Sequence, residues 1–379
     1  MALSLFFYGT LRHVPLLEAV LGVAPGTLHP RLSDAVLPDH RVSWVRDEAY
    51  PMIEKSAGVM AQGVMLRDVS EDEEERLRYY EGAFSYHLSD VQIDVDGQVR
   101  KAACFYPMAS KQTRGAEWHL RDWVRIWGDM AVGAARDVMA RRARYDAETA
   151  ANLHPFLMAR HWSRMLARRT AAPTTSRFTP QDGDVAITAR GEGYRGFFEL
   201  AEFQLNHRRF DGSRSSTVSR EAFVAYDAAL VLPYDPKTDH ILLIEQLRFG
   251  PLWREDPRPW VLEPIAGLVD AGEDPADAAR REAMEEAALT LGQLEPMVGV
   301  YASPGYSTEF FHCFLGVTDL SEFKTSNGGL ASEHEDIRSH VMPYGRAMDL
   351  VGTGEINAGP LVMMLYWLAA ERDRLRASA

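Results

Sequence analysis

The chain has 379 residues, of which 46% are hydrophobic and 25% charged, a composition typical of a folded globular protein. This length exceeds what one hydrophobic core usually supports, so we expect two domains. The 41 basic and 54 acidic residues leave a net charge of −13, and no basic tract interrupts the chain. That balance argues against nucleic-acid binding. No apolar run is long enough for a membrane span, so we expect no membrane partner.

The two cysteines, Cys104 and Cys313, lie in separate halves of the chain. Neither has a second Cys or a His at metal-ligand spacing, so both are predicted to be core residues. Such cysteine usage is typical of a reducing compartment, and we expect a cytoplasmic location.

The N-terminal part of the chain mixes predicted short strands and turns, beginning with FFYGTLRH (6–13). This apolar run is short and has no basic region before it, so it is predicted to be a strand and not a signal peptide. Gly9 follows Tyr8 and frees the backbone. The N–H groups of Thr10 and Leu11 can then point into a cavity and hold a carboxylate.

Residues 70–95 predict a helix, a turn and a strand. Ser70 and Glu73 have the spacing of a capping box at the helix start. Glu81 is predicted just after the helix, where an apolar pocket would raise its pKa and suit it to proton transfer. The aromatic residues nearest to it in the sequence are Tyr79, Tyr80 and Phe84.

The YGTLR turn, together with YEG and a tyrosine four residues later (80–86), resembles the gamma-glutamylcyclotransferase-like family, also called AIG2-like. The resemblance covers roughly residues 3–110 and implies a small β-barrel with helices. It implies that the turn binds a γ-glutamyl group through Tyr8, Gly9, Thr10 and Leu11. It also implies that Glu81 moves a proton while the α-amine attacks the γ-carbonyl. Catalysis and a pocket used only for binding or assembly both stay open.

Residues 117–168 read as two helical stretches, and residues 171–182 are rich in Thr and Pro, as expected of a linker. The predicted domains are therefore 1–170, including the helical extension, and 183–379. The second domain mixes strand patterns with a helix in its middle and a last helix at about 358–376. This order predicts an α+β fold with helices on both sides of a sheet.

The segment GLVDAGEDPADAARREAMEEAAL (267–289) predicts a helix behind a glycine turn. Asp274 is a suitable N-cap and Pro275 a suitable first residue. Arg281 lies four residues before Glu285, so the two are expected to pair along the helix. We infer that Arg281 orients Glu285 and leaves Glu282 and Glu286 freer to bind a divalent metal. A small apolar stripe would let this helix lie close to a sheet: Ala276, Ala279, Ala283 and Ala287.

This segment resembles the Nudix box, in which a glycine, a glutamate and an R-E-x-x-E-E run recur at fixed spacing. Here these are Gly267, Glu273 and residues 281–286. The pattern departs once, since Ala288 stands where the family has glycine. Alanine adopts a positive φ less readily, so we expect the helix to run slightly longer.

Four flanking segments extend the resemblance to the ADP-ribose pyrophosphatase branch of the Nudix hydrolases, a fold with an α/β/α sandwich. They are IEQLRFGP (244–251), PWVLEPIAG (259–267), SPGYSTE (303–309) and GLASEHEDI (329–337). The resemblance implies Mg²⁺, with Mn²⁺ as an alternative, held by Glu282, Glu286, Glu335 and the Ala266 carbonyl. It implies that Glu333 is the general base.

The same resemblance implies substrate contacts around the metal. Arg248 would bind phosphate, and Glu263 would face the metal or the terminal ribose. Glu309 is a weaker candidate for ribose hydroxyls, and Arg220 would reach adenine or phosphate, across a dimer interface in the family. The family's dimers exchange N-terminal strands, and residues 194–212 occupy that place here, so a homodimer is expected by resemblance.

The implied reaction is hydrolysis of ADP-ribose to AMP and ribose 5-phosphate. Another nucleoside diphosphate sugar of the GDP-mannose type is the alternative substrate, and a non-catalytic nucleotide sensor is the alternative function. The retained glutamates argue against the sensor. The combination of the two domains resembles the TrgB group, named for tellurite resistance.

Overall fold

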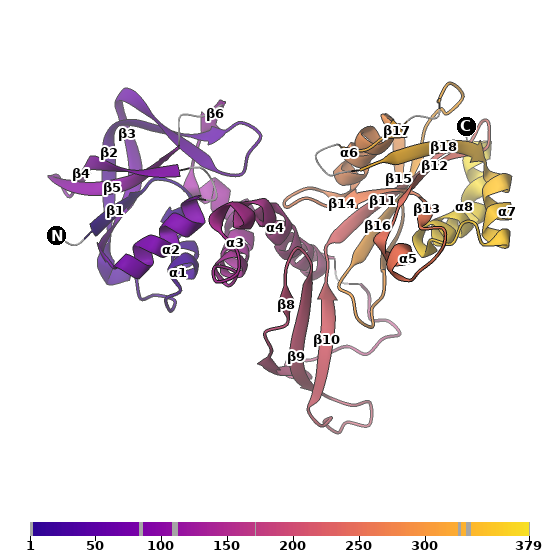
Figure 1. Ribbon diagram of the computed structural model, residues 1–379, viewed down its shortest axis with the longest axis horizontal. Coiled ribbons are helices and arrows are strands. Elements are labelled where there is room, and N and C mark those ends of the chain that lie inside the picture. Colours follow the sequence, from indigo (N-terminus) through magenta and orange to yellow (C-terminus); the bar gives the residue numbers. More distant parts are fainter. Residues whose placement is uncertain are drawn as a thin grey trace. The chain divides into compact units, whose positions relative to one another are not determined.

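A computed structural model of the protein describes residues 3–82, 86–107, 113–170, 172–324, 327–330 and 335–378. The chain divides into two compact units, Met1–Arg164 and Met165–Ala379 (Figure 1). The predicted linker at 171–182 stays a prediction. No helix of the described ranges is long and apolar enough to cross a bilayer. Cys104 and Cys313 are both buried and free, as expected.

The first unit is built on a closed β-barrel. Its strands are β1 (Leu3–Phe7), β2 (Leu32–Val45), β3 (Pro51–Val69), β4 (Tyr86–Val95), β5 (Gln98–Pro107) and β6 (Arg114–Glu117). The order is β3-β1-β5-β4-β2-β6, and β2 also pairs with β3. The barrel closes because this extra pairing returns the sheet to its first strand. The predicted small barrel is therefore confirmed.

The barrel core follows from strand alternation, in which every second side chain points inward. Phe6, Tyr8, Ala35, Leu37 and Cys104 belong to one buried cluster in the barrel. β1 runs parallel to β5, while β1–β3 and β2–β3 are antiparallel. The short turn after β1 therefore begins at the end of a buried strand.

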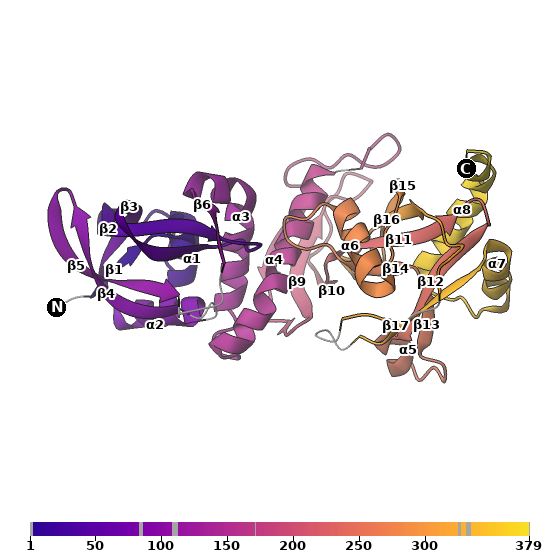
Figure 2. The same cartoon turned by 90° about the horizontal axis from the view of Figure 1, so that it is seen from above.

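The other regular elements up to Arg169 are helices, and the first of them lie beside the barrel (Figures 1 and 2). They are η1 (Thr10–Arg12), α1 (Val14–Leu21), η2 (His29–Arg31), α2 (Glu71–Gly82), α3 (Leu120–Met139) and α4 (Ala147–Arg169). The capping box of α2 is formed, since Ser70 N donates to Glu73 at 2.9 Å and Glu73 N donates to Ser70 Oγ at 3.3 Å. Glu81 was predicted to follow this helix, but it lies in the last turn, because α2 continues to Gly82.

The second unit contains two sheets. The first consists of β7 (Val185–Arg190), β8 (Tyr194–Arg195), β9 (Glu199–His207) and β10 (Val218–Val224). The second has eight strands, which are β11 (Asp227–Asp235), β12 (His240–Leu247), β13 (Trp260–Glu263), β14 (Ile265–Leu268), β15 (Gln293–Tyr301), β16 (Phe310–Val317), β17 (Asn327–Gly328) and β18 (Ile337–Pro343).

Helices lie on both faces of the eight-stranded sheet, with α6 (Pro275–Ala287) on one face and α7 (Tyr344–Thr353) and α8 (Gly359–Ala377) on the other (Figures 1 and 2). The short α5 (Phe249–Trp253) follows β12. Leu230 and Leu232 of β11 pack with α7 and α8, while the alternate residues Ala229 and Val231 are also fully buried. β11 is thus covered on both faces, which confirms the predicted sandwich and the α+β class.

The expectation that α6 is slightly longer because Ala288 replaces a glycine is wrong. The helix ends at Ala287, and Ala288 takes the left-handed conformation with φ 49° and ψ 35°. Two hydrogen bonds close this end, from Ala288 N to Met284 O and from Leu289 N to Ala283 O. The first of these is the single bond of an αL cap. The turn returns buried Leu289 to the core, which offsets the cost of a positive φ at alanine. The start is as predicted, since Asp274 accepts from Ala276 N at 2.8 Å.

Candidate functional site

The glycine turn at Gly267 lies directly against the glutamates of α6. A Cβ at this position would lie 1.9 Å from Glu282 Oε1, so a side chain here would displace that carboxylate. Gly328 lies equally close to the backbone of α6, since a Cβ there would lie 1.9 Å from the main-chain carbonyl oxygen of Glu286. Gly267 is the first glycine of the box pattern, and its lack of a side chain leaves room for Glu282. Gly328 was missed, although the Gly328–Gly329 pair was a visible signal.

Arg281 is the centre of an ion-pair network that fixes the helix to the turn. It donates to Glu273 from Nε at 3.0 Å and from Nη2 at 3.1 Å, and to Leu268 O at 3.0 Å. The predicted pair with Glu285 is formed at 2.9 Å. Arg281 Nη1 also donates to Glu282 at 2.6 Å, so Glu282 is not as free of this arginine as expected. Burial alone would lower the pKa of Arg281, but Glu273 and Glu282 outweigh it and raise the pKa.

Glu282 and Glu286 are held in surroundings that oppose their ionisation. Glu286 is 2% exposed, and its Oε2 accepts from Ala266 N at 3.1 Å. Burial raises the pKa of Glu286 well above its ordinary value, and the charges of Glu282 and Glu335 add to this effect. Burial likewise raises the pKa of Glu282 to about 7, although Arg281 acts in the opposite direction. A divalent cation fits this set, because it would relieve the repulsion and its preferred ligands are oxygens.

Glu335 reaches the same cluster from the segment before β18. Its Oε2 accepts from Leu330 N at 3.1 Å, and its charge acts on both Glu282 and Glu286. Glu333 lies outside the described residues, so its assignment as the base stays a prediction. Over the described ranges, no three His, Cys, Asp or Glu side chains are already grouped to hold a metal ion.

The predicted substrate residues gather beside these glutamates. Arg248 caps α5 after β12, and its Nε donates to Glu263 Oε2 at 2.6 Å. Burial raises the pKa of Glu263 and of Glu309, and the charge of Arg248 opposes both shifts. The charge of Arg248 also acts on Glu286. The guanidinium of Arg248 therefore lies near both the predicted metal ligand Glu286 and the predicted substrate residue Glu263. Its side chain stays 41% exposed and is accessible to a ligand.

Arg220 is not brought to this cluster within one chain. It lies exposed on β10, in the other sheet of the unit, and its Nη1 donates to Ser219 O at 2.8 Å. Its predicted substrate role therefore depends on a second subunit.

The first unit gathers a second set of predicted residues inside its barrel. Burial raises the pKa of Glu81 to about 8, as expected for a carboxyl group in an apolar pocket. The charge of Glu81 acts on Tyr8 and Tyr86, so the end of α2 lies close to the residue that follows β1 and to the start of β4. Tyr79 points elsewhere, since its hydroxyl donates to Tyr145 O at 3.1 Å. Phe84 lies outside the described residues.

The turn after β1 is short. Gly9 leads into η1, where Arg12 N donates to Gly9 O at 3.0 Å. That the N–H groups of Thr10 and Leu11 hold a carboxylate stays a prediction. A Cβ at Gly9 would lie 3.0 Å from Pro51 Cγ, which makes a side chain there tight.

Each unit therefore has its own characteristic feature. The second unit is an α/β/α sandwich with a glutamate-bearing helix, and the first is a barrel with the carboxyl group of Glu81 beside buried tyrosines. A family model for the NUDIX domain matches residues 225–362, and one for gamma-glutamyl cyclotransferase, AIG2-like, matches residues 5–125. Both predicted resemblances are confirmed, and the chain belongs to the Nudix family.

Relatives of known function match about half of this chain. ADP-ribose pyrophosphatase of Escherichia coli (strain K12) is 40% identical over 195 residues, which cover 51% of this chain and 91% of that protein. ADP-ribose pyrophosphatase of Haemophilus influenzae is 38% identical over 197 residues, 52% of this chain and 90% of the relative. GDP-mannose pyrophosphatase of Escherichia coli (strain SMS-3-5 / SECEC) is 32% identical over 172 residues, 45% and 88% of the two chains.

Proposed function

We propose that the second unit hydrolyses the diphosphate of ADP-ribose. One water adds across the P–O–P bridge, which breaks to give AMP and ribose 5-phosphate. The observation that carries this proposal is the set Glu282, Glu286 and Glu335, of which Glu286 is buried, with Arg248 beside it. The 40% identity to an ADP-ribose pyrophosphatase supports the choice of substrate.

Each group has a task that its chemistry suits. Glu282, Glu286, Glu335 and the Ala266 carbonyl would hold Mg²⁺, which neutralises diphosphate charge and acidifies a water when bound. Arg248 binds a phosphate oxygen, since a guanidinium matches that geometry. Arg281 holds Glu285 and the turn in place. Glu333 is proposed to take the proton of the attacking water.

GDP-mannose is the second candidate substrate, because a GDP-mannose pyrophosphatase is 32% identical to this chain. Both substrates present the same diphosphate to the same glutamates. A panel of nucleoside diphosphate sugars, assayed for AMP and GMP release with Mg²⁺, distinguishes them. We expect the highest kcat/KM with ADP-ribose.

Glu282→Gln tests the site. The change keeps the size of the side chain but removes the anionic ligand, so we expect turnover to fall by about 100-fold or more. Glu322→Gln is the matched control, since Glu322 is exposed in the same unit. Circular dichroism of both variants checks the fold. Unchanged turnover in a folded Glu282→Gln protein would show that Glu282 does not serve the reaction.

We also propose that the barrel of the first unit is a γ-glutamyl pocket. Glu81, with its pKa near 8, can exchange a proton at neutral pH beside Tyr8 and Tyr86. If the pocket is catalytic, the wild-type protein converts γ-glutamyl amino acids to 5-oxoproline and the Glu81→Gln variant does not. If no donor yields 5-oxoproline, the pocket serves binding alone.

Finally, we propose that the protein is a homodimer through the second unit. Several large apolar side chains lie exposed at and near β8 and β9, in the segment 194–212 that the sequence assigned to this task. They are Tyr194 (50% exposed), Phe197 (44%), Phe198 (49%) and Leu200 (39%). Exposed clusters of this kind are typical of protein interfaces.

A further inference from the structure

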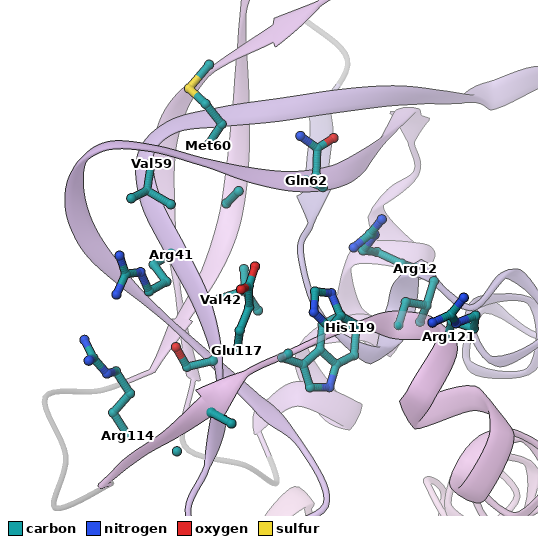
Figure 3. Close-up of a pocket in the computed structure, with 16 residues that line it drawn as sticks. Arg12, Arg41, Val42, Val59, Met60, Gln62, Arg114, Glu117, His119 and Arg121 are labelled. Carbon is teal, nitrogen blue, oxygen red and sulfur yellow. The ribbon is translucent and has the colours of Figure 1, made fainter.

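Two features of the first unit are used by none of the functions proposed above. One is a pocket of about 860 Å³ on β2, β3 and β6 and at the start of α3 (Figure 3). Its arginines are balanced by acidic groups in and beside the lining, which are Asp34, Glu54, Glu117 and Asp122. Charge there does not indicate an anionic ligand. The other feature is a histidine–tyrosine pair inside the barrel.

This pair joins His40 of β2 to Tyr106 of β5. His40 is only 9% exposed, and its Nε2 lies 2.7 Å from the Tyr106 hydroxyl. Its other ring nitrogen, Nδ1, lies 2.7 Å from Pro38 O. The two rings meet edge to face, with centroids 5.8 Å apart. A buried imidazole is thus held at both nitrogens, and one of its partners is a second side chain that can exchange a hydrogen bond with a ligand.

A local irregularity in β2 turns His40 toward the barrel interior. Leu37 belongs to the interior cluster and Val42 packs against it, although strict alternation would put residues five apart on opposite faces. The change occurs at Asp39, which adopts a φ of 57° where the register of β2 with β3 shifts. Asp39 Oδ1 accepts from Gly58 N at 2.7 Å, which offsets the strain. His40 thereby lies on the face of Val42, and irregularities that re-aim a side chain in this way are frequent next to active sites.

The partners of His40 fix the direction of both hydrogen bonds. A carbonyl oxygen only accepts, so Nδ1 of His40 carries a hydrogen and donates to Pro38 O. In the neutral ring Nε2 then has no hydrogen, and it accepts from the hydroxyl of Tyr106. That hydroxyl has a single hydrogen, so its oxygen can only accept from any further group. The pair therefore turns Tyr106 into a hydrogen-bond acceptor for a ligand.

Tyr106 lies beside the predicted γ-glutamyl residues. The parallel pair β1–β5 sets Phe6 opposite Cys104, and two residues further along the same face of each strand are Tyr8 and Tyr106. Burial raises the pKa of Tyr106 to about 12, and the charge of Cys104 adds to this shift. Burial also raises the pKa of Cys104, with the charge of Glu81 adding to it. Glu81 and Tyr106 are thus both close to the Cys104 thiol.

We propose that Tyr106 binds the α-amino group of a γ-glutamyl ligand and that His40 is its positioning residue, an assignment that rests on the γ-glutamyl pocket proposed above. The α-amine is on the same carbon as the α-carboxylate, which the turn after Tyr8 is predicted to hold. An oxygen that can only accept suits the N–H groups of this amine. A ligand without the amine leaves the oxygen unpaired, so Tyr106 selects for the amine.

The same contact would serve the ring closure. The nitrogen of the neutral α-amine bonds to the γ-carbonyl carbon, and the amide C–N bond to the departing amino acid breaks. One amine proton passes through Glu81 to the departing nitrogen. A hydrogen bond from the other N–H to Tyr106 holds the amine while its lone pair attacks.

Two ligands that differ only in the α-amine test the assignment, γ-L-glutamyl-L-alanine and glutaryl-L-alanine. Both are titrated by calorimetry into the full-length Glu81→Gln protein, which prevents turnover. We expect the ligand with the amine to bind about tenfold or more tightly. The further change Tyr106→Phe should remove this preference. Tyr79→Phe is the matched control, because Tyr79 is a half-buried tyrosine of the same unit whose hydroxyl donates to Tyr145 O instead. Thermal melts check that the variants are folded.

The role of His40 is tested by the state of its ring. Long-range proton–nitrogen NMR spectra at pH 8 should show a hydrogen on Nδ1 and none on Nε2, and Tyr106→Phe should shift the Nε2 signal. A hydrogen on Nε2 would overturn the assigned direction of the hydrogen bond. If neither ligand binds, the γ-glutamyl pocket fails and this assignment with it. Equal binding of the two ligands, or a preference that survives Tyr106→Phe, would overturn this assignment alone.

Discussion

Glu81 and Glu282 are carboxyl groups for which burial raises the pKa, yet the two have different neighbours. Glu282 accepts a hydrogen bond from Arg281 and lies among other glutamates, so a bound cation would favour its ionised form. Glu81 lies among Tyr8, Tyr80 and Tyr86 without a cationic partner among the causes of its shift. The neutral form of Glu81 is therefore favoured. At pH values between its ordinary and its raised pKa, the folded protein keeps a proton on Glu81 that the unfolded chain releases.

This difference predicts a pH-dependent stability. The pKa of Glu81 is about 8 in the folded protein against 4.5 ordinarily, so between these values the folded state binds more protons. Stability then falls as pH rises from about 4.5 to 8. Glu81→Gln removes this effect. Each of the roughly three pH units between pH 5 and 8 contributes about 1.4 kcal/mol, so the free energy of unfolding of the variant should gain on that of the wild type by up to about 4 kcal/mol at pH 8.5 compared with pH 5.

Thermal unfolding at the two pH values measures this gain. Glu75→Gln is the control, because Glu75 is exposed on the same helix. A gain of Glu81→Gln that is independent of pH would contradict the raised pKa.

At this scale, local spacing predicted what lies within one or two turns of helix. The Arg281–Glu285 pair, the Asp274 cap and the Ser70–Glu73 box were all found from such spacing. The contact of Glu282 with Gly267 and that of Gly328 with Glu286 were not, because they join segments that the sheet brings together. Spacing in the sequence carries no information on such approaches.

At the scale of elements, the sequence predicted the regular periodic segments and failed where tertiary packing decides. The α6 platform and the C-terminal helix follow from apolar patterns and turn residues, whereas the barrel was expected from the family resemblance. The end of α6 does not follow from such patterns, since buried Leu289 pulls the chain back and overrides the preference of Ala288.

At the scale of the whole molecule, each unit has its own buried core, so each can support its own site. The second unit nevertheless leaves an apolar surface uncovered on its smaller sheet. Phe198 contacts Phe197 and Phe223 at ring-centroid distances of 4.9 and 5.0 Å, so the exposed aromatic rings form one cluster. Such a surface is stabilised when a second copy covers it, and a two-fold axis lets the same cluster serve both copies.

We therefore expect a solution mass near twice 42.5 kDa for the wild type, by light scattering with size-exclusion chromatography. Phe198→Asp places a charge in the proposed interface and should give the monomer mass, with the circular dichroism spectrum retained. Val99→Asp introduces the same charge at a 73% exposed apolar residue of the first unit and should leave the dimer intact. A monomeric wild type would refute the dimer. A dimer that withstands Phe198→Asp would place the interface on another surface and leave Arg220 without its proposed route to the partner's substrate.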